Sequence, residues 1–193
     1  MTSRLVRGAG PGYPSTNVKS NLVLTVISED RPGLVDQLSK TIVKFDANWE
    51  SSRMARLGGR FAGILLVSVD AARVADLEAA IAELADASGM HVVIQPTDTA
   101  ADDSQRDTFS LELMGTDHPG IIHDISHVLA AREINVEEMR TDCDAAPMGG
   151  GDLFKMIATL TSPPSTDMEA LRTALEEVAN DLMVDITLRS PDA

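Results

Sequence analysis

Three residue types that suit the binding of a free amino acid occur near the start of the chain. Asp30 opens a D-x-P-G sequence that ends at Gly33, and Asn48 follows it. Because a helix is expected after the proline, the backbone N–H groups at Gly33 and Leu34 would point out of the helix end and bind a carboxylate. Asp30 would accept a hydrogen bond from an ammonium group, and the Asn48 amide can both donate and accept. The set predicts a site for a small zwitterion.

The same set occurs a second time, 87 residues further along the chain. The segments Leu22–Arg53 and Phe109–Arg140 align without a gap, and their apolar positions match in kind. The chain is therefore a tandem duplication. The second set of predicted ligand-binding residues is Asp117, Gly120, Ile121 and Asn135.

A structural role is the alternative for the aspartates and asparagines. An aspartate before a helix is commonly a cap, and an asparagine after a helix is a common stop. A structural requirement would be duplicated together with the fold. The recurrence of Asp30 and Asn48 as Asp117 and Asn135 is therefore compatible with both roles, and the sequence leaves the two open.

Histidines in the second copy suggest a different chemistry, namely metal binding. His123 and His127 stand at i and i+4, the spacing of the H-E-x-x-H zinc motif, and His118 lies nearby. An aspartate replaces the glutamate that this motif uses as a base, and both histidines lie opposite the apolar stripe of the expected helix. Their counterparts in the first copy, Asp36 and Lys40, predict an exposed ion pair. We predict no metal ligands and keep a small metal-dependent enzyme as an alternative.

Other reactive residues form no recognisable catalytic group. Cys143 is the single cysteine, which excludes an internal disulfide and suits a structural thiol in a reducing compartment. Glu50 and Glu137 are each followed by an arginine on the same expected strand, and we expect each pair to form a salt bridge. Gly149–Gly151 lacks the lysine and the helix of a phosphate-binding loop. No catalytic constellation occurs in both copies, so we predict a protein that is not an enzyme, without a cofactor.

Each copy predicts six elements in the order β-α-β-β-α-β. A short apolar strand precedes the D-x-P-G turn, whose proline suits the first helical turn. Leu34, Leu38 and Ile42 then form an apolar stripe that faces a sheet. A strand pair with a tight turn at Leu57–Gly59, a second helix and a last strand complete the unit. The predicted fold class is α+β, with two tandem ferredoxin-like units.

The duplication and an acidic, polar stretch between the copies set the predicted domain limits. Residues 1–20, rich in Gly, Pro and Ser, are expected to be a mobile leader without the pattern of a signal peptide. The first domain is predicted at 21–96, the linker at 97–106 and the second domain at 107–190. Each domain is long enough to bury a core of its own.

Composition disfavours several classes of function. The net charge is −14, and the 16 Lys and Arg residues form no basic cluster, which opposes direct binding to the phosphates of a nucleic acid. No apolar run approaches the roughly 18 residues that a membrane span needs. Together with the single cysteine, these features predict a cytoplasmic protein that binds neither nucleic acid nor membrane directly.

With the D-x-P-G turn at the first strand–helix junction and an asparagine at the start of the second strand, the units resemble ACT domains, the ligand-sensing modules of amino-acid metabolism. The tandem arrangement, with DRPGLVDQLSKTI and NWESSRMARLGGRFAGILLVSV, resembles the bacterial glycine cleavage system transcriptional repressor family. The resemblance covers roughly Asn21 to Arg189. It implies a regulator that responds to glycine and binds a partner protein, the transcriptional activator of glycine-cleavage genes.

Isolated four-stranded units expose unpaired strand edges, which are a liability unless they pair. We expect two domains, or two chains in a homodimer, to join edges with the ligand sites at the seam. An ACT adaptor that has lost ligand binding is a further alternative. It is suggested by the link between the middle strands of the second copy, Ala145–Asp152, which is longer than its counterpart in the first.

Overall fold

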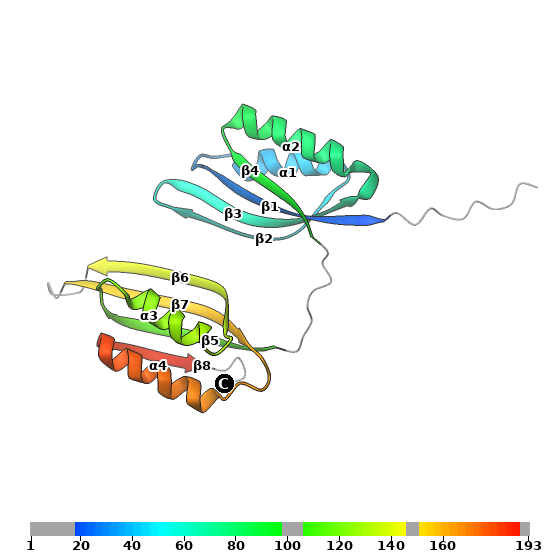
Figure 1. Ribbon diagram of the computed structural model, residues 1–193. Helices are drawn as coiled ribbons and strands as arrows, with labels where there is room; N and C mark the ends of the chain where they lie inside the picture. The colour runs from blue at the N-terminus through cyan, green and yellow to red at the C-terminus, as the bar shows by residue number, and fades with distance from the viewer. Residues whose placement is uncertain (1–17, 98–105, 146–150, 190–193) are drawn as a thin grey trace, which may run out of the picture. The chain divides into compact units, whose positions relative to one another are not determined.

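The computed structural model describes residues 18–97, 106–145 and 151–189 of the chain. The chain divides into two compact units, Met1–Ala101 and Asp102–Ala193 (Figure 1). The leader at 1–20 and the linker at 97–106 fall almost wholly outside the described residues, as does most of the long hairpin link of the second copy.

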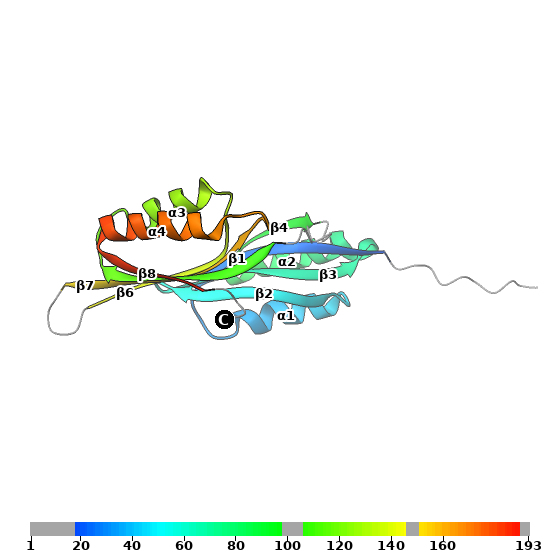
Figure 2. The same cartoon turned by 90° about the horizontal axis from the view of Figure 1, so that it is seen from below.

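Both units have the element order expected of a ferredoxin-like fold, so the predicted α+β class is confirmed. Each sheet has four antiparallel strands, in the order β2-β3-β1-β4 in the first unit and β6-β7-β5-β8 in the second. The two helices of each unit lie on one face of its sheet, as Figures 1 and 2 show. The first unit consists of β1 (Lys19–Glu29), α1 (Leu34–Lys44), β2 (Asn48–Leu57), β3 (Arg60–Asp70), a 3₁₀ turn (Ala71–Arg73), α2 (Val74–Ser88) and β4 (His91–Thr97). The second consists of β5 (Asp107–Thr116), α3 (Ile121–Ala130), β6 (Asn135–Ala145), β7 (Asp152–Ser162), α4 (Met168–Leu182) and β8 (Val184–Arg189).

Each unit has a hydrophobic core of its own, mostly aliphatic, with Phe109 and Phe154 buried in that of the second. The predicted stripe of α1 is buried, with Leu34, Leu38 and Ile42 packed against apolar residues of the sheet such as Leu24 and Leu65. In the described part of the chain, the core clusters of the two units have no residue in common. The second unit repeats the arrangement with Ile121, Ile125 and Leu129 of α3. The spacing of apolar residues therefore placed both first helices correctly against their sheets.

The turn between β2 and β3 is the tight hairpin that the sequence predicted. Gly58 and Gly59 have φ angles of 56° and 77°, a pair of left-handed residues that matches the twist of a two-residue hairpin. The D-x-P-G turn differs from the prediction in one detail. Pro32 lies before the helix rather than in its first turn, because Gly33 caps α1 in a left-handed conformation and Leu34 is the first helical residue.

Both edge strands that follow the first helices carry a bulge at the same place. In β2 the pairing with β3 shifts register between Trp49 and Ser51, so Glu50 is the extra residue. In β6 the shift falls between Val136 and Glu138, which makes Glu137 the extra residue. The bulge is thus a duplicated feature of the fold.

Candidate ligand sites

The first helix of each unit begins with an end that no side chain caps. Gly33 and Gly120 occupy the cap positions of α1 and α3 with φ angles of 92° and 109°, and neither helix start receives a side-chain cap hydrogen bond. A Cβ built on Gly33 would meet no atom within 4 Å, so this backbone faces open space. The helix start of α4, in contrast, is capped by the carboxylate of Asp167. The uncapped N–H groups of α1 and α3 suit a carboxylate.

Asp30 lies beside the helix start of α1, where β1 ends. Its backbone N–H donates to the carbonyl of Gly59 at 3.2 Å, and its carboxylate forms an ion pair with the Arg56 guanidinium at 2.6 Å. Both side chains are open to solvent, Arg56 more than Asp30. The carboxylate predicted to hold an ammonium group therefore already has a cationic partner in this unit.

Asp117 takes the same place in the second unit but has a different neighbour. Its backbone N–H donates to the backbone carbonyl of Asp152 at 2.8 Å, just as that of Asp30 donates to the carbonyl of Gly59 in the hairpin of the first unit. The position aligned with Arg56 is Cys143, a free, exposed cysteine. Desolvation raises the pKa of the Cys143 thiol, and its hydrogen bond to Asp117 and the negative charge of that carboxylate raise it further. The thiol stays protonated at neutral pH, so the position next to Asp117 holds a neutral group where Asp30 has a guanidinium.

Asn48 lies at the opposite end of the sheet from Asp30, which corrects the prediction that the two residues lie in one binding site. Asn48 pairs with Ser68 of β3, and Ser68 pairs in turn with Asn21 near the start of β1. Asp30 follows nine residues later on the same chain, which corresponds to roughly 30 Å of extended strand. Asn135, paired with Thr161, is separated from Asp117 in the same way.

The structure therefore divides each predicted site into two halves. The helix-start half consists of Asp30, Gly33 and Leu34 in the first unit, where Leu34 contributes backbone alone because its side chain is buried. The strand-start half is Asn48 with its neighbours. The corresponding halves in the second unit are Asp117, Gly120 and Ile121 on one side and Asn135 on the other.

The strand-start half of the first unit is a hydrogen-bonded polar cluster on an exposed edge. The buried Ser68 hydroxyl donates to Glu50 Oε1 at 2.5 Å. This bond lowers the pKa of the Glu50 carboxyl, and a hydrogen bond from the Asn48 side chain lowers it further. In the second unit the strand partner of Asn135 is Thr161. The Thr161 hydroxyl is buried and has no hydrogen-bond partner among the described residues. Among the described residues, the bulged glutamate thus accepts these hydrogen bonds in the first unit and not in the second.

The structure places the predicted aspartates in no helix cap and the predicted asparagines in no helix stop. Asp30 and Asp117 cap no helix, because α1 and α3 have no side-chain cap. The left-handed residues that follow the two helices are Asp46 and Glu133, with φ angles of 52° and 57°, so the asparagines are not the stop residues. The expected salt bridge of Glu137 with Arg140 is also wrong, because Arg140 pairs with Asp142 at 3.0 Å.

The variable residue of the D-x-P-G sequence has a structural role that its spacing did not predict. Arg31 donates from Nη2 to the carbonyl of Ser88, the last residue of α2, at 2.5 Å. His118, its counterpart, lies 3.0 Å through Nε2 from the carbonyl of Leu182, the last residue of α4. A basic group at a helix C-terminus satisfies a free carbonyl and complements the helix dipole. The signal was present as a basic residue at the same position of both copies.

His118 makes the stability of the second unit depend on pH. Hydrogen bonds with the carbonyl of Pro119 and then that of Leu182 raise the pKa of His118 above its ordinary value. A raised folded-state pKa stabilises the unit fully below the unfolded-state value of about 6.5, and this contribution is lost as pH rises through the folded-state pKa. We expect the melting temperature of the second unit to fall, relative to that of His118→Arg, which stays charged, as pH rises from about 6.5 through the raised pKa of His118. A difference between the two proteins that does not change with pH would contradict this.

The remaining histidines form no metal site among the described residues. His123 and His127 are exposed on α3, and their rings lie 6.4 Å apart between centroids with an interplanar angle of 26°. No group of three or more His, Cys, Asp or Glu side chains in the described part of the chain is arranged to hold a metal ion. Both ring nitrogens of His118 face backbone carbonyls. Within the described ranges, no helix has the length and apolar character needed to span a bilayer.

Comparison with known proteins agrees with the duplicated fold. Residues 20–95 match the ACT domain family. The chain is 22% identical over 161 residues to the glycine cleavage system transcriptional repressor of Escherichia coli K12, across 83% of this chain and 85% of the relative. The crystal structure of a putative glycine cleavage system transcriptional repressor superposes with a TM-score of 0.65 and 17% identity, over 89% of this chain and 97% of that one.

A more similar solved structure is that of an unknown protein from Galdieria sulphuraria. It is 32% identical, with a TM-score of 0.79 over 90% of this chain and 99% of that chain. At this identity and coverage the two chains belong to one family. The second unit repeats the topology of the first, strand for strand. The chain is therefore a tandem ACT-domain protein that resembles the bacterial glycine cleavage system transcriptional repressors.

Proposed function

We propose that this chain is a cytoplasmic regulator that binds a small amino acid, glycine or a close analogue, and acts through a partner protein that activates transcription of amino-acid metabolism genes. The observation that carries the proposal is the duplicated, uncapped helix start with an aspartate beside it. It offers N–H groups for a carboxylate and a carboxylate for an ammonium group. The relatedness to a named transcriptional repressor supports the choice of ligand and partner.

A protein partner fits the charge of the chain better than direct contact with DNA. A net charge of −14 repels phosphates, whereas it attracts a basic regulator. The enzyme alternative built on His118, His123 and His127 has less support, because the ring nitrogens of His118 are engaged by carbonyls and the other two rings lie on the exposed face of α3. The named relatives are regulators.

The helix start of the second unit is the stronger candidate for the ammonium group. Asp30 would have to exchange the Arg56 guanidinium for the ligand, whereas Asp117 has a neutral thiol at that position. An ion pair between exposed groups is worth little, so the first site is weakened rather than blocked. We propose that glycine binds to both helix starts and more tightly to the one at Gly120.

The asparagines can join a helix-start half only from outside its own unit. Within one unit Asn48 is roughly 30 Å from Asp30 along the sheet, too far for one small ligand. The strands that carry Asn48 and Asn135 are edge strands, which favour pairing with another chain. We propose a homodimer in which the strand start of one copy completes the helix start of the other.

Asp117→Asn is expected to weaken glycine binding about ten- to hundredfold, because the ammonium group loses a charge-assisted hydrogen bond. Asp30→Asn, the matched variant, is expected to change affinity less, since Arg56 already partners that carboxylate. Calorimetric titration of the full chain with glycine measures both. Equal affinity in wild type and both variants would remove the helix starts from the site.

Asn48→Ala and Asn135→Ala test the second half of the same site. If a second copy contributes the asparagine, both variants weaken binding, and glycine affinity of the wild type falls on dilution below the dimer dissociation constant. An affinity independent of protein concentration and of both asparagines would restrict the site to the helix starts.

A further inference from the structure

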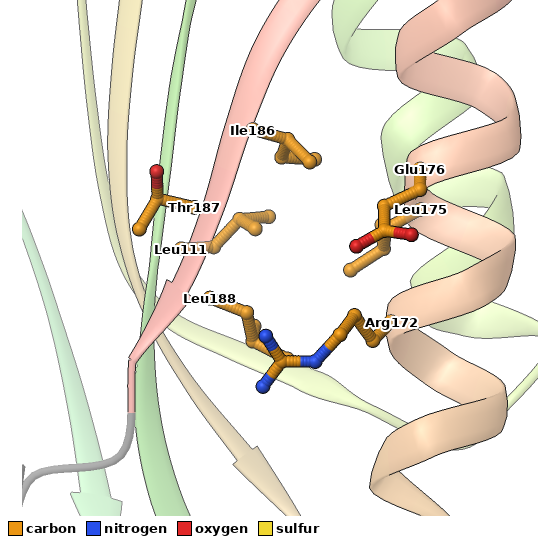
Figure 3. A pocket seen from close by; sticks show the side chains of 7 residues that line it. All are labelled: Leu111, Arg172, Leu175, Glu176, Ile186, Thr187 and Leu188. Carbon is orange, nitrogen blue, oxygen red and sulfur yellow. The ribbon is translucent and has the colours of Figure 1, made fainter.

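A small open pocket lies between α4 and the edge strand β8, away from the helix starts. Its volume is about 120 Å³. Figure 3 shows α4 and β8 facing each other across it, with Leu175 on the helix side and Ile186 and Leu188 on the strand side. Leu111 and Leu175, which are 0% and 1% exposed, belong to the core beneath. The pocket is therefore lined by aliphatic carbon on its inner sides.

Two opposite charges stand on α4 beside this apolar lining. Arg172 and Glu176 are one helical turn apart, and both side chains extend from α4 towards the strand (Figure 3). Both residues are exposed. Within the described ranges neither forms an ion pair with the other or with any other residue. A guanidinium and a carboxylate are thus both available at the mouth of an aliphatic pocket.

This combination matches the chemistry of an amino acid with an aliphatic side chain. The guanidinium presents parallel N–H donors to a carboxylate, and the Glu176 carboxylate accepts from an ammonium group. A dry apolar cavity of about 150 Å³ holds a benzene molecule, so a pocket of about 120 Å³ has room for the branched hydrocarbon of valine or leucine. Glycine, which lacks this hydrocarbon, would leave the apolar part empty.

The first unit provides a natural contrast. The buried residues of α2 and α4 correspond as Leu77 with Leu171 and Ile81 with Leu175. In this alignment the positions of Arg172 and Glu176 are occupied by Glu78 and Ala82, so the first unit has no cation there. The charge pair is therefore present in one copy only, so the shared fold does not require it.

We infer that the second unit has a separate site, between α4 and β8, for an α-amino acid with a branched aliphatic side chain. Arg172 binds the carboxylate, Glu176 binds the ammonium group, and Ile186, Leu188 and Leu175 enclose the side chain. The site shares no residue with the helix starts proposed for glycine, so it goes beyond the proposed function. One chain would then report on two classes of amino acid.

Titration of the full chain with three related probes tests each contact separately. L-leucine carries both charges, isovalerate lacks the ammonium group, and isopentylamine lacks the carboxylate. Arg172→Gln is expected to weaken L-leucine and isovalerate about ten- to hundredfold and to leave isopentylamine unchanged. Glu176→Gln is expected to weaken L-leucine and isopentylamine and to leave isovalerate unchanged. Both substitutions are on an exposed helix face, so the fold is retained.

Two further variants separate this site from the glycine site and from nonspecific binding. Glu78→Gln, at the aligned position of the first unit, is expected to leave L-leucine affinity unchanged. Leu188→Phe fills the pocket and is expected to abolish L-leucine binding without affecting glycine. Absence of L-leucine binding to the wild type, or binding that Asp117→Asn weakens and Arg172→Gln does not, would overturn the inference.

Discussion

Leu38→Ala is expected to remove about 2–5 kcal/mol of unfolding free energy from the first unit and to leave the unfolding of the second unchanged. Leu38 is 2% exposed in the middle of the α1 stripe, so its removal leaves a cavity among core residues that cannot close over it. Among the described residues the two cores share no member, so we expect the second unit to be unaffected by the cavity. A domain of this size is stable by only about 5–15 kcal/mol, so the calorimetric unfolding transition of the first unit is expected to shift to a much lower temperature.

Two matched variants give this result its meaning. Ile125→Ala changes the aligned position of α3 and is expected to lower the second transition and spare the first. Val35→Ala changes a residue of α1 that is 45% exposed, and its effect is expected to stay within about 0.5 kcal/mol. If Leu38→Ala and Ile125→Ala moved one common transition equally, the two units would not unfold independently.

Gly115→Val is expected to cost the second unit about 3 kcal/mol, the upper part of the range for overpacking. A Cβ at Gly115 would lie 2.5 Å from Cγ1 of Val184 and 2.9 Å from its Cα, and the second of these atoms belongs to the backbone of β8. Since β8 pairs with β5 at this point, the strand must shift away to make room. Chemical denaturation followed by circular dichroism measures the loss.

The neighbouring residue controls for the change of side chain. Met114→Val alters a residue of β5 that is 48% exposed on the other side of the strand, and its expected cost is within about 0.5 kcal/mol. A Gly115→Val protein as stable as Met114→Val would show that β8 adapts to the added atoms. In that case the close approach of β5 and β8 is not a requirement of the fold.

Apolar periodicity was sufficient to predict the fold, because the side chains that become buried are apolar and recur at the spacing of a helix face or a strand face. The stripe Leu34, Leu38 and Ile42 is buried as expected. The turn at Gly58 and Gly59 was equally legible, since two left-handed residues in succession need glycine. Strand ends were less accurate: β1 has 11 residues, Lys19–Glu29, where a short apolar strand was predicted, because polar strand ends pair with β3 as well as apolar residues do.

The site could be predicted only in part, because contacts depend on direction as well as spacing. Asn48 lies close to α1 in sequence, but α1 has 11 residues and carries the chain about 16 Å back along the sheet. That return places Asn48 at the end opposite Asp30. The pairing of Asp30 with Arg56 was hidden for the same reason, since it depends on how β2 and β1 lie around β3.

Two features depend on contacts between residues far apart in sequence, which spacing cannot predict. One is the contact of Arg31 and His118 with the C-terminal carbonyls of α2 and α4, and the other is the pocket between α4 and β8. His118 was considered as a metal ligand because two other histidines follow it, whereas its partner is Leu182, distant in sequence. Arg172 and Glu176 look like an ordinary helical ion pair when read in sequence. Only the position of β8 across from them gives their arrangement a binding role.

The duplicated bulge limits how long a strand can be added to the chain. β2 and β6 are edge strands, so an added strand would pair along their free sides. A bulge interrupts regular backbone pairing, which leaves Ser51–Leu57 in the first unit, roughly 20 Å of uninterrupted ladder. Because Glu50 and Glu137 occupy aligned positions, the second unit begins its ladder at the corresponding residue, Glu138. Both edges therefore admit an added strand that starts in the same register.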